Sequence, residues 1–133
     1  VIYLIVRGIC CLRPERKNLS ENIKVISIIG EYLEHSRLYY FHNSGDPVIY
    51  SGSDDVMIRS FKRRVESLFK INDEFIKKQE ITILNYNLID NKNAYILNED
   101  GSYDRIKNKR KPFSVFSEFY KLDKTKIDNS IVL

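Results

Sequence analysis

The sequence predicts an α/β fold in a single domain. Two segments rich in β-branched and apolar residues, Val1 to Val6 and Ile23 to Ile29, have the composition of strands buried on both faces of a sheet. A third segment, Asn72 to Leu88, places apolar residues near helical spacing. The 133 residues suffice for one hydrophobic core and are few for an enzyme of several domains.

The first strand is expected to end at Arg7 and Gly8. Ligands of α/β proteins collect just beyond the carboxyl ends of strands, so Arg7 is placed either to clamp a phosphate or to form a structural ion pair. Its position alone does not separate the two. The following segment, Leu12 to Asn22, contains Pro14 and several charges, and it is predicted to be an exposed loop.

The second strand is expected to end at Gly30, and Glu31 to Glu34 to form a short helical turn. A hairpin follows, with strands over Arg37 to His42 and Val48 to Gly52. The turn formers at 43–47 connect them, and Gly45 among them can take a positive φ. Since a hairpin returns the end of its second strand to the start of its first, residues 53–55 are predicted to lie beside residues 35–37.

The rest of the chain predicts a polar connection, one strand, one long helix, a second hairpin and a short terminal helix. The polar connection covers Asp55 to Arg64, the strand Val65 to Ile71 and the long helix Asn72 to Leu88. The second hairpin pairs Asn93 to Leu97 with Ser102 to Ile106, and the terminal helix covers Phe113 to Leu122 after Pro112. Asn72 and Asp73 are both suitable N-caps for the long helix. The apolar stripe of this helix, with Phe75 and Ile76, is expected to face the core, and the last ten residues to fray.

The stretch from His35 to Asp55 has the residue types of half a phosphate-binding site. His35 can act as nucleophile or proton donor, and Arg37 can grip phosphate oxygens in a bidentate manner. Ser53 and Asp55 supply a hydroxyl and a carboxylate that could orient the imidazole, and Glu66 is a further candidate for that role. The alternative is a solvated loop histidine, because short spacing patterns carry false positives.

A basic cluster follows this stretch: Arg59, Lys62, Arg63 and Arg64. Such clusters most often form solvated faces, but this one directly follows a candidate anion site. Arg59 is therefore added to the supporting residues of that site, and the other three are weaker candidates.

Composition excludes some classes of protein. With 43% hydrophobic and 30% charged residues the chain is globular, and a net charge of +4 favours anionic partners without identifying them. The adjacent Cys10 and Cys11 are poorly placed to bridge each other and indicate reduced thiols of a cytosolic protein. The apolar run at the N-terminus is too short for a membrane span, and no signal peptide is visible.

Several separated motifs closely resemble the C-terminal domain of the first family of bacterial polyphosphate kinases. They are Leu4 to Leu12, Leu19 to Ile23, Ser27 to Arg37, Gly45 to Pro47 and Ser53 to Asp55. The resemblance is dense over residues 1–71 and looser beyond, where it depends on Arg110, Lys111 and the terminal helix. The chain has no initiator methionine and starts inside a strand pattern, so we expect residues 1–133 to be one domain cut from a longer protein of this family.

The resemblance implies a phospholipase-D-like domain, with a mixed sheet flanked by helices. It also implies part of a phosphotransferase that reversibly transfers the terminal phosphate of ATP to inorganic polyphosphate, with Mg²⁺. Enzymes of the family act on ATP or ADP and polyphosphate without nucleic acid, are oligomeric, and are cytoplasmic and in some cases membrane-associated. We expect no transmembrane segment in this chain.

The resemblance also assigns roles to particular residues. Arg7 and His35 match positions that contact nucleotide phosphates, and His35 matches the second of two essential histidines. The first, which carries the phosphoryl group, and the residues associated with magnesium match nothing in this chain, so we expect no metal ligands here and no turnover by this chain alone. Where the family often has an aromatic residue or leucine, this chain has Val56, which leaves the packing beside the hairpin open.

On this interpretation Arg7 and Arg37 supply positive charge to the phosphoryl oxygens, and His35 acts as proton donor or electrostatic partner. Asp55 or Glu66 would fix the tautomer of the imidazole. Two other functions stay open. A phospholipase-D-like phosphodiesterase or nuclease would use similar groups, although its usual lysine is replaced by Arg37, and a non-catalytic basic module for nucleic acid is supported by charge alone.

Overall fold

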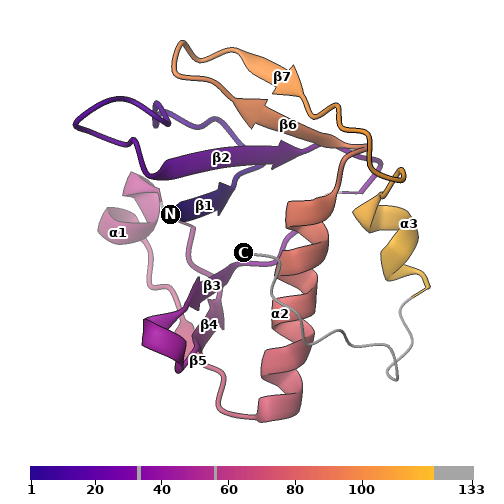
Figure 1. Ribbon diagram of the computed structural model, residues 1–133. Coiled ribbons are helices and arrows are strands. Elements are labelled where there is room, and N and C mark those ends of the chain that lie inside the picture. Colours follow the sequence, from indigo (N-terminus) through magenta and orange to yellow (C-terminus); the bar gives the residue numbers. More distant parts are fainter. Residues whose placement is uncertain (33, 56, 122–133) are drawn as a thin grey trace.

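Figure 1 shows the computed structural model, which describes residues 1–32, 34–55 and 57–121. Over these residues the chain forms two sheets and three α-helices, so the predicted α/β class is confirmed. The final residues expected to fray lie outside the described part, as does Val56. No helix of the described part is long and apolar enough to cross a membrane.

The larger sheet has the order β1-β2-β6-β7 and is mixed. Its strands are β1 (Ile2–Ile5), β2 (Ile23–Ile28), β6 (Ala94–Leu97) and β7 (Tyr103–Arg105). β1 pairs with β2 in parallel, whereas β6 is antiparallel to both β2 and β7. β7 therefore runs in the same direction as β1 and β2, and the carboxyl ends of these three strands lie at the same end of the sheet.

Only one of the two strands predicted to be buried on both faces is so. β2 holds Val25 and Ile28 at 0% and 3% exposure, as expected. β1 instead lies at the sheet edge, and Ile2 and Tyr3 are 52% and 40% exposed. An apolar run shows that a segment favours a strand but does not show its place in the strand order, which explains the error for β1.

The smaller sheet has the order β3-β4-β5, with β3 (Leu38–Phe41), β4 (Val48–Gly52) and β5 (Leu68–Lys70). The predicted hairpin is confirmed, because β3 and β4 pair antiparallel and Leu38 lies opposite Ser51. Their connection is a 3-10 turn over Asn43–Gly45, in which Gly45 takes the positive φ of 99° expected for a glycine.

The helices are α1 (Ile58–Arg63), α2 (Glu74–Ile89) and α3 (Val115–Phe119). α2 is confirmed, and Asp73 is its N-cap, because the carboxylate accepts hydrogen bonds from the backbone of Phe75 and Ile76 at 2.9 Å. The polar connection predicted over residues 55–64 was wrong in that it contains α1. The helical turn predicted at Glu31 to Glu34 was wrong at residues 31, 32 and 34, which belong to no helix, and residue 33 lies outside the described part.

The predicted core stripe of α2 was wrong at its first turn, where Phe75 and Ile76 are 50% and 38% exposed. The core lies on one face of the larger sheet, around Ile26, Ile28, Ala94 and Val115. Among the residues of α2, Tyr86 and Leu88, near its C-terminal end, are the ones that pack against this core. Residues of α3 pack beside them. Figure 1 shows the reason, since α2 approaches the larger sheet with its C-terminal end and its first turns lie far from that sheet.

Candidate functional site

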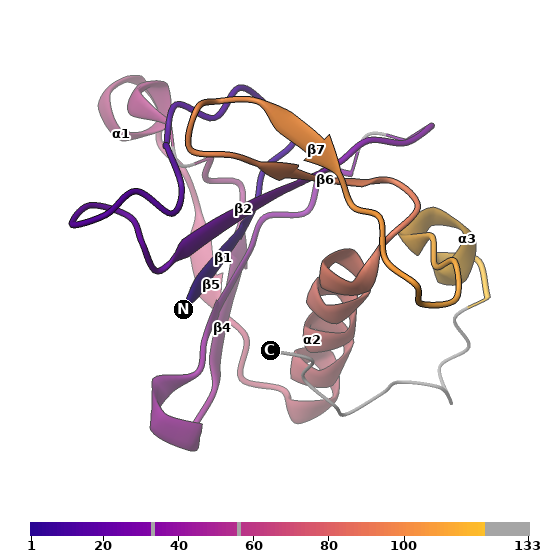
Figure 2. The ribbon, with the colours of Figure 1, turned by 45° about the horizontal axis from the view of Figure 1, so that its top comes forward.

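The candidate site begins at the carboxyl ends of β1 and β2. Arg7 lies two residues after β1, and its Nη1 donates a hydrogen bond of 2.6 Å to the backbone oxygen of Tyr32. The segment that follows β2 is therefore attached to the end of β1. In Figure 2 this segment projects beyond the end of the larger sheet before the chain turns back.

Glu34 organises the backbone around His35. Its Oε1 accepts hydrogen bonds of 3.0 Å from the backbone N–H of His35 and of Ser36, and one of 2.5 Å from the Ser36 hydroxyl. Partial burial works against ionisation, but the hydrogen bonds from Ser36 and His35 and the charge of Arg7 outweigh it, so the pKa of Glu34 lies below its ordinary value. The segment 34–36 thus has a defined shape beside Arg7.

The charge of Arg7 acts on the carboxyl of Glu34, and this gives a first prediction. We expect it to titrate below the ordinary pKa in an NMR pH titration, and the Arg7→Ala change to raise that pKa by removing a nearby positive charge. Because the folded-state pKa is lowered, the carboxylate stabilises the fold above its unfolded-state pKa of about 4, and this contribution is lost as pH falls through the folded-state value. Arg16→Ala is the control. An identical titration midpoint of Glu34 in the wild type, Arg7→Ala and Arg16→Ala would show that Arg7 does not act on Glu34.

Arg37 and Asp55 form the ion pair that closes the site on the side of the smaller sheet. Arg37 Nε donates to Asp55 Oδ1 at 2.7 Å, and Nη1 donates to the backbone oxygen of His35 at 3.3 Å. The hydrogen bond to Asp55 raises the pKa of Arg37, which partial burial alone would lower, and the negative charges of Asp55 and Glu66 add to the rise. The predicted return of residue 55 to the beginning of β3 is confirmed by this contact.

Ser53 and Glu66 form a second pair at the same end of the smaller sheet. The Ser53 hydroxyl donates to Glu66 Oε2 at 2.6 Å and accepts from the backbone N–H of Ser67 at 3.1 Å. The backbone N–H of Ser53 in turn donates to the Ser67 oxygen at 2.9 Å. These contacts extend the pairing of β4 with β5 and fix the Gly52 to Asp55 segment.

Asp55 and Glu66, the carboxylates predicted to orient His35, contact other residues of the site. Asp55 Oδ1 accepts from Arg37 and Glu66 Oε2 accepts from Ser53, while the side chain of His35 is exposed, so their role in fixing the tautomer of the imidazole stays a prediction. His35 is held through its backbone, because its N–H donates to Glu34 and its carbonyl oxygen accepts from Arg37. The side chain of Arg59, in α1, lies outside the described part, so its predicted role keeps the status of a prediction.

Two groups that the sequence did not single out, Glu34 and the Tyr32 carbonyl, link Arg7 to His35. A glutamate two residues before a serine is a local signal for the cap that Glu34 makes, since a side-chain oxygen can accept from nearby backbone N–H groups. The contact to the Tyr32 carbonyl has no such signal, because it joins positions 25 residues apart.

The described part of the chain has no group of three His, Cys, Asp or Glu side chains able to hold a metal ion. Divalent cations such as Mg²⁺ are held by carboxylate, carbonyl and water oxygens. The carboxylates of the site are instead engaged with Arg37 and Ser53. Residues 1–32, 34–55 and 57–121 therefore offer no cluster of carboxylates for Mg²⁺.

Taken together, the site offers two arginines and one exposed histidine around a short, hydrogen-bonded segment. Arg7 follows β1 and Arg37 directly precedes β3, and each donates one guanidinium N–H to a backbone oxygen of the segment 32–36, that of Tyr32 and that of His35. Guanidinium groups with N–H donors left over can bind phosphate oxygens. The arrangement is suited to binding an anion of high charge, such as a di- or triphosphate.

Comparison with known proteins gives a consistent result. Residues 1–115 match the family model described as polyphosphate kinase C-terminal domain 2. The chain is 46% identical over 113 residues to a polyphosphate kinase of Staphylococcus saprophyticus, covering 85% of this chain and 16% of that protein. It is 53% identical over 102 residues to the polyphosphate kinase of Synechocystis sp., covering 77% of this chain and 14% of that protein.

The fold agrees with a solved structure. The crystal structure of polyphosphate kinase from Porphyromonas gingivalis superposes with a TM-score of 0.86 at 36% sequence identity, over 90% of this chain and 18% of that one. The chain thus spans between 14% and 18% of the length of these proteins.

Proposed function

Because the chain belongs to the polyphosphate kinase family, as a C-terminal domain of it, we propose that it forms part of an ATP:polyphosphate phosphotransferase. The reaction transfers the terminal phosphate of ATP reversibly to inorganic polyphosphate. The role of this chain is to bind the nucleotide phosphates and to contribute His35. The observation that carries this role is the convergence of Arg7 and Arg37 on the segment that holds His35.

The two arginines act through charge. Phosphoryl transfer has a loose transition state whose negative charge is spread over the phosphoryl oxygens, so positioning and cationic stabilisation carry most of the catalysis. Asp55 fixes the direction of the Arg37 guanidinium through a hydrogen-bonded ion pair. Arg7 is fixed by the Tyr32 carbonyl, so both cations are positioned before the substrate binds.

His35 serves as proton donor or electrostatic partner to the phosphates. Its backbone is fixed by Glu34 and its side chain is exposed, which leaves the imidazole accessible to a ligand. Ser53, Asp55 and Glu66 support the site by fixing the end of β4 and the direction of Arg37. Arg59 is proposed as a further support.

The remaining components come from outside this chain. Mg²⁺ is proposed to enter with ATP, and its protein ligands to lie in other parts of the enzyme, since the described residues offer no metal site. The phosphorylated histidine is also proposed to lie in another domain, so this chain alone binds substrates without turning them over. The complete enzyme is proposed to be a cytoplasmic homo-oligomer.

An ATP titration of the 133-residue chain tests the site. We expect Arg7→Ala and His35→Ala each to weaken ATP binding by about tenfold or more, the loss typical of a charge-assisted hydrogen bond to a phosphate. Matched controls exist for both. Arg16 lies in the loop that leads to the start of β2, at the opposite edge of the sheet, and His42 follows β3 at the end away from His35.

The controls and a cleavage assay make the result decisive. Arg16→Ala and His42→Ala should change ATP affinity by less than about twofold. Equal losses in all four variants would show that no specific site exists. Hydrolysis of a generic phosphodiester by the chain would point to a phosphodiesterase, and robust polyphosphate synthesis by the chain alone would contradict the proposed division of the site between domains.

A further inference from the structure

A second group of cations lies at the same end of the larger sheet as Arg7, where β1, β2 and β7 have their carboxyl ends. It lines a hollow of about 420 Å³ formed where β7 ends and where β6 begins. Half of the eight lining residues are cationic and none is acidic: Lys92, Arg105, Lys107 and Arg110. We call this hollow the basic groove. Because the carboxyl ends of β1, β2 and β7 lie at the same end of the sheet, the basic groove and the phosphate site both lie at that end.

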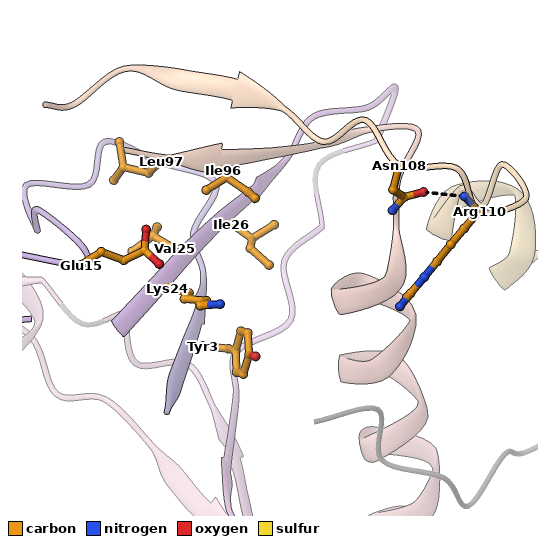
Figure 3. Close-up of a pocket in the computed structure, with 9 residues that line it drawn as sticks. All are labelled: Tyr3, Glu15, Lys24, Val25, Ile26, Ile96, Leu97, Asn108 and Arg110. Carbon is orange, nitrogen blue, oxygen red and sulfur yellow. Dashed lines mark hydrogen bonds between the residues drawn. The ribbon is translucent and has the colours of Figure 1, made fainter. Parts of the chain in front are cut away.

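Asn91 gives the basic groove a fixed shape. Its Nδ2 donates to Asn108 Oδ1 at 2.9 Å and to the backbone oxygen of Lys111 at 3.1 Å, and its Oδ1 accepts from the backbone N–H of Phe113 at 2.8 Å. The backbone N–H of Arg110 donates to Asn108 Oδ1 at 3.2 Å, as the dashed line in Figure 3 shows. The basic loop over residues 107–111 is thus tied to the end of α2.

The part of the chain that the structure describes does not neutralise the charge in the basic groove. Within residues 1–32, 34–55 and 57–121, the four cations take part in no ion pair, and the Arg105 guanidinium donates instead to the Lys92 carbonyl at 2.6 Å. Clustered like charges raise the local positive potential and attract anions. The basic groove is therefore complementary to a ligand that carries several negative charges in a row.

The basic groove continues into a second hollow. A cavity of about 520 Å³ shares Asn108 and Arg110 with it and includes Lys24 and one acidic residue, Glu15. In Figure 3 the side chain of Arg110 extends away from its loop, and it lines this cavity together with Tyr3 and Lys24. An elongated ligand can therefore pass Arg110 and contact cations on both sides of it.

We propose that the basic groove binds inorganic polyphosphate along its length, away from the phosphate that is transferred. This proposal rests on the proposed function, because it takes its ligand from the same reaction. The lining favours polyphosphate over single-stranded nucleic acid. The basic groove contains cations, two asparagines, Ile106 and Pro112 but no aromatic ring, and the adjoining cavity has a single one, Tyr3. Proteins that bind single strands stack successive bases on several aromatic side chains.

The test compares two double variants of one loop in the 133-residue chain. Lys107→Gln with Arg110→Gln removes two charges that line the basic groove, whereas Lys109→Gln with Lys111→Gln removes two charges of the same loop that do not. All four residues are exposed, so both variants should fold. The probes are long-chain polyphosphate, tripolyphosphate and ATP, each titrated at two salt concentrations.

We expect the groove variant to bind long-chain polyphosphate roughly tenfold more weakly and to lose about one to two units of the salt slope. The control variant should stay within about twofold of the wild type, and ATP binding should be unchanged in both. Equal losses in the two variants, or no binding of long-chain polyphosphate by the wild type, would overturn the proposal. So would equally tight binding of a single-stranded oligonucleotide with the same dependence on Lys107 and Arg110.

Failure here is distinguishable from failure of the proposed function. If Arg7→Ala weakens ATP binding while the groove variant binds long-chain polyphosphate normally, the phosphate site stands and the basic groove is not a polyphosphate site. If the groove variant loses polyphosphate and Arg7→Ala leaves ATP binding intact, the basic groove stands and the phosphate site is wrongly placed.

Discussion

Replacing Asp90 with alanine is expected to lower the free energy of unfolding by about 3 kcal/mol or more. Asp90 is 1% exposed and ends α2. Its Oδ1 accepts from the backbone N–H groups of Lys92 and Asn93 at 2.9 and 2.6 Å, and its Oδ2 accepts from Asn93 Nδ2 at 3.1 Å and from Val115 N–H at 2.9 Å. One carboxylate thus joins the end of α2, the start of β6 and the start of α3, and its loss leaves buried donors without an acceptor.

Urea unfolding of three variants measures this contribution. Asp90→Asn keeps the shape and one acceptor oxygen, so it should cost less than alanine but more than a surface change. Asp100 is the control. It makes similar contacts with Ser102 but is exposed, so Asp100→Ala should cost less than about 1 kcal/mol. Similar stabilities of Asp90→Ala and Asp100→Ala would show that the buried carboxylate does not hold these elements together.

Replacing Gly52 with alanine is expected to cost about 2 kcal/mol or more and to disturb the phosphate site. A Cβ at position 52 would lie 2.0 Å from the backbone oxygen of Ser67 and 2.9 Å from the Cα of Leu68. Both atoms belong to backbone, so no side-chain rotation can relieve the overlap. β4 and β5 must separate, which breaks the contact between Ser53 and Glu66 and shifts the segment that carries Asp55.

Stability and ATP affinity should therefore fall together in Gly52→Ala. Gly8→Ala is the matched control for stability, since a Cβ at position 8 would meet nothing within 4 Å, and its cost should stay below about 0.5 kcal/mol. The close approach of β5 to Gly52 would be refuted by a Gly52→Ala chain as stable as wild type in urea. Loss of stability with unchanged ATP affinity would separate the sheet from the site.

Local patterns in the sequence were sufficient for the elements that form within a short span. The β3–β4 hairpin, α2 with Asp73 as its cap and the hairpin of β6 and β7 all form near their predicted positions. In each of them the turn residues and the apolar spacing act over fewer than 20 residues. The juxtaposition of Arg37 with Asp55 followed from the same reasoning, because a hairpin fixes which residues meet.

Features set by distant contacts could not be predicted in this way. The edge position of β1 and the division into two sheets depend on which strands pair, and the strand patterns are alike for an edge and a centre. The hydrogen bond between Ser53 and Glu66 was not predicted either, because it joins the end of β4 to the segment before β5. The role of Asp90 was not predicted, because its burial between three elements depends on contacts that only the fold brings together.

The phosphate site is tested most directly by the ATP affinity of the wild-type, Arg7→Ala and His35→Ala chains at about 50 and 200 mM salt. We expect both substitutions to weaken binding by about tenfold at each concentration, with only a modest response to salt, because the contacts are specific hydrogen bonds as well as charges. Binding that falls steeply with salt and ignores both substitutions would contradict the site, and would leave the chain with nonspecific attraction to anions.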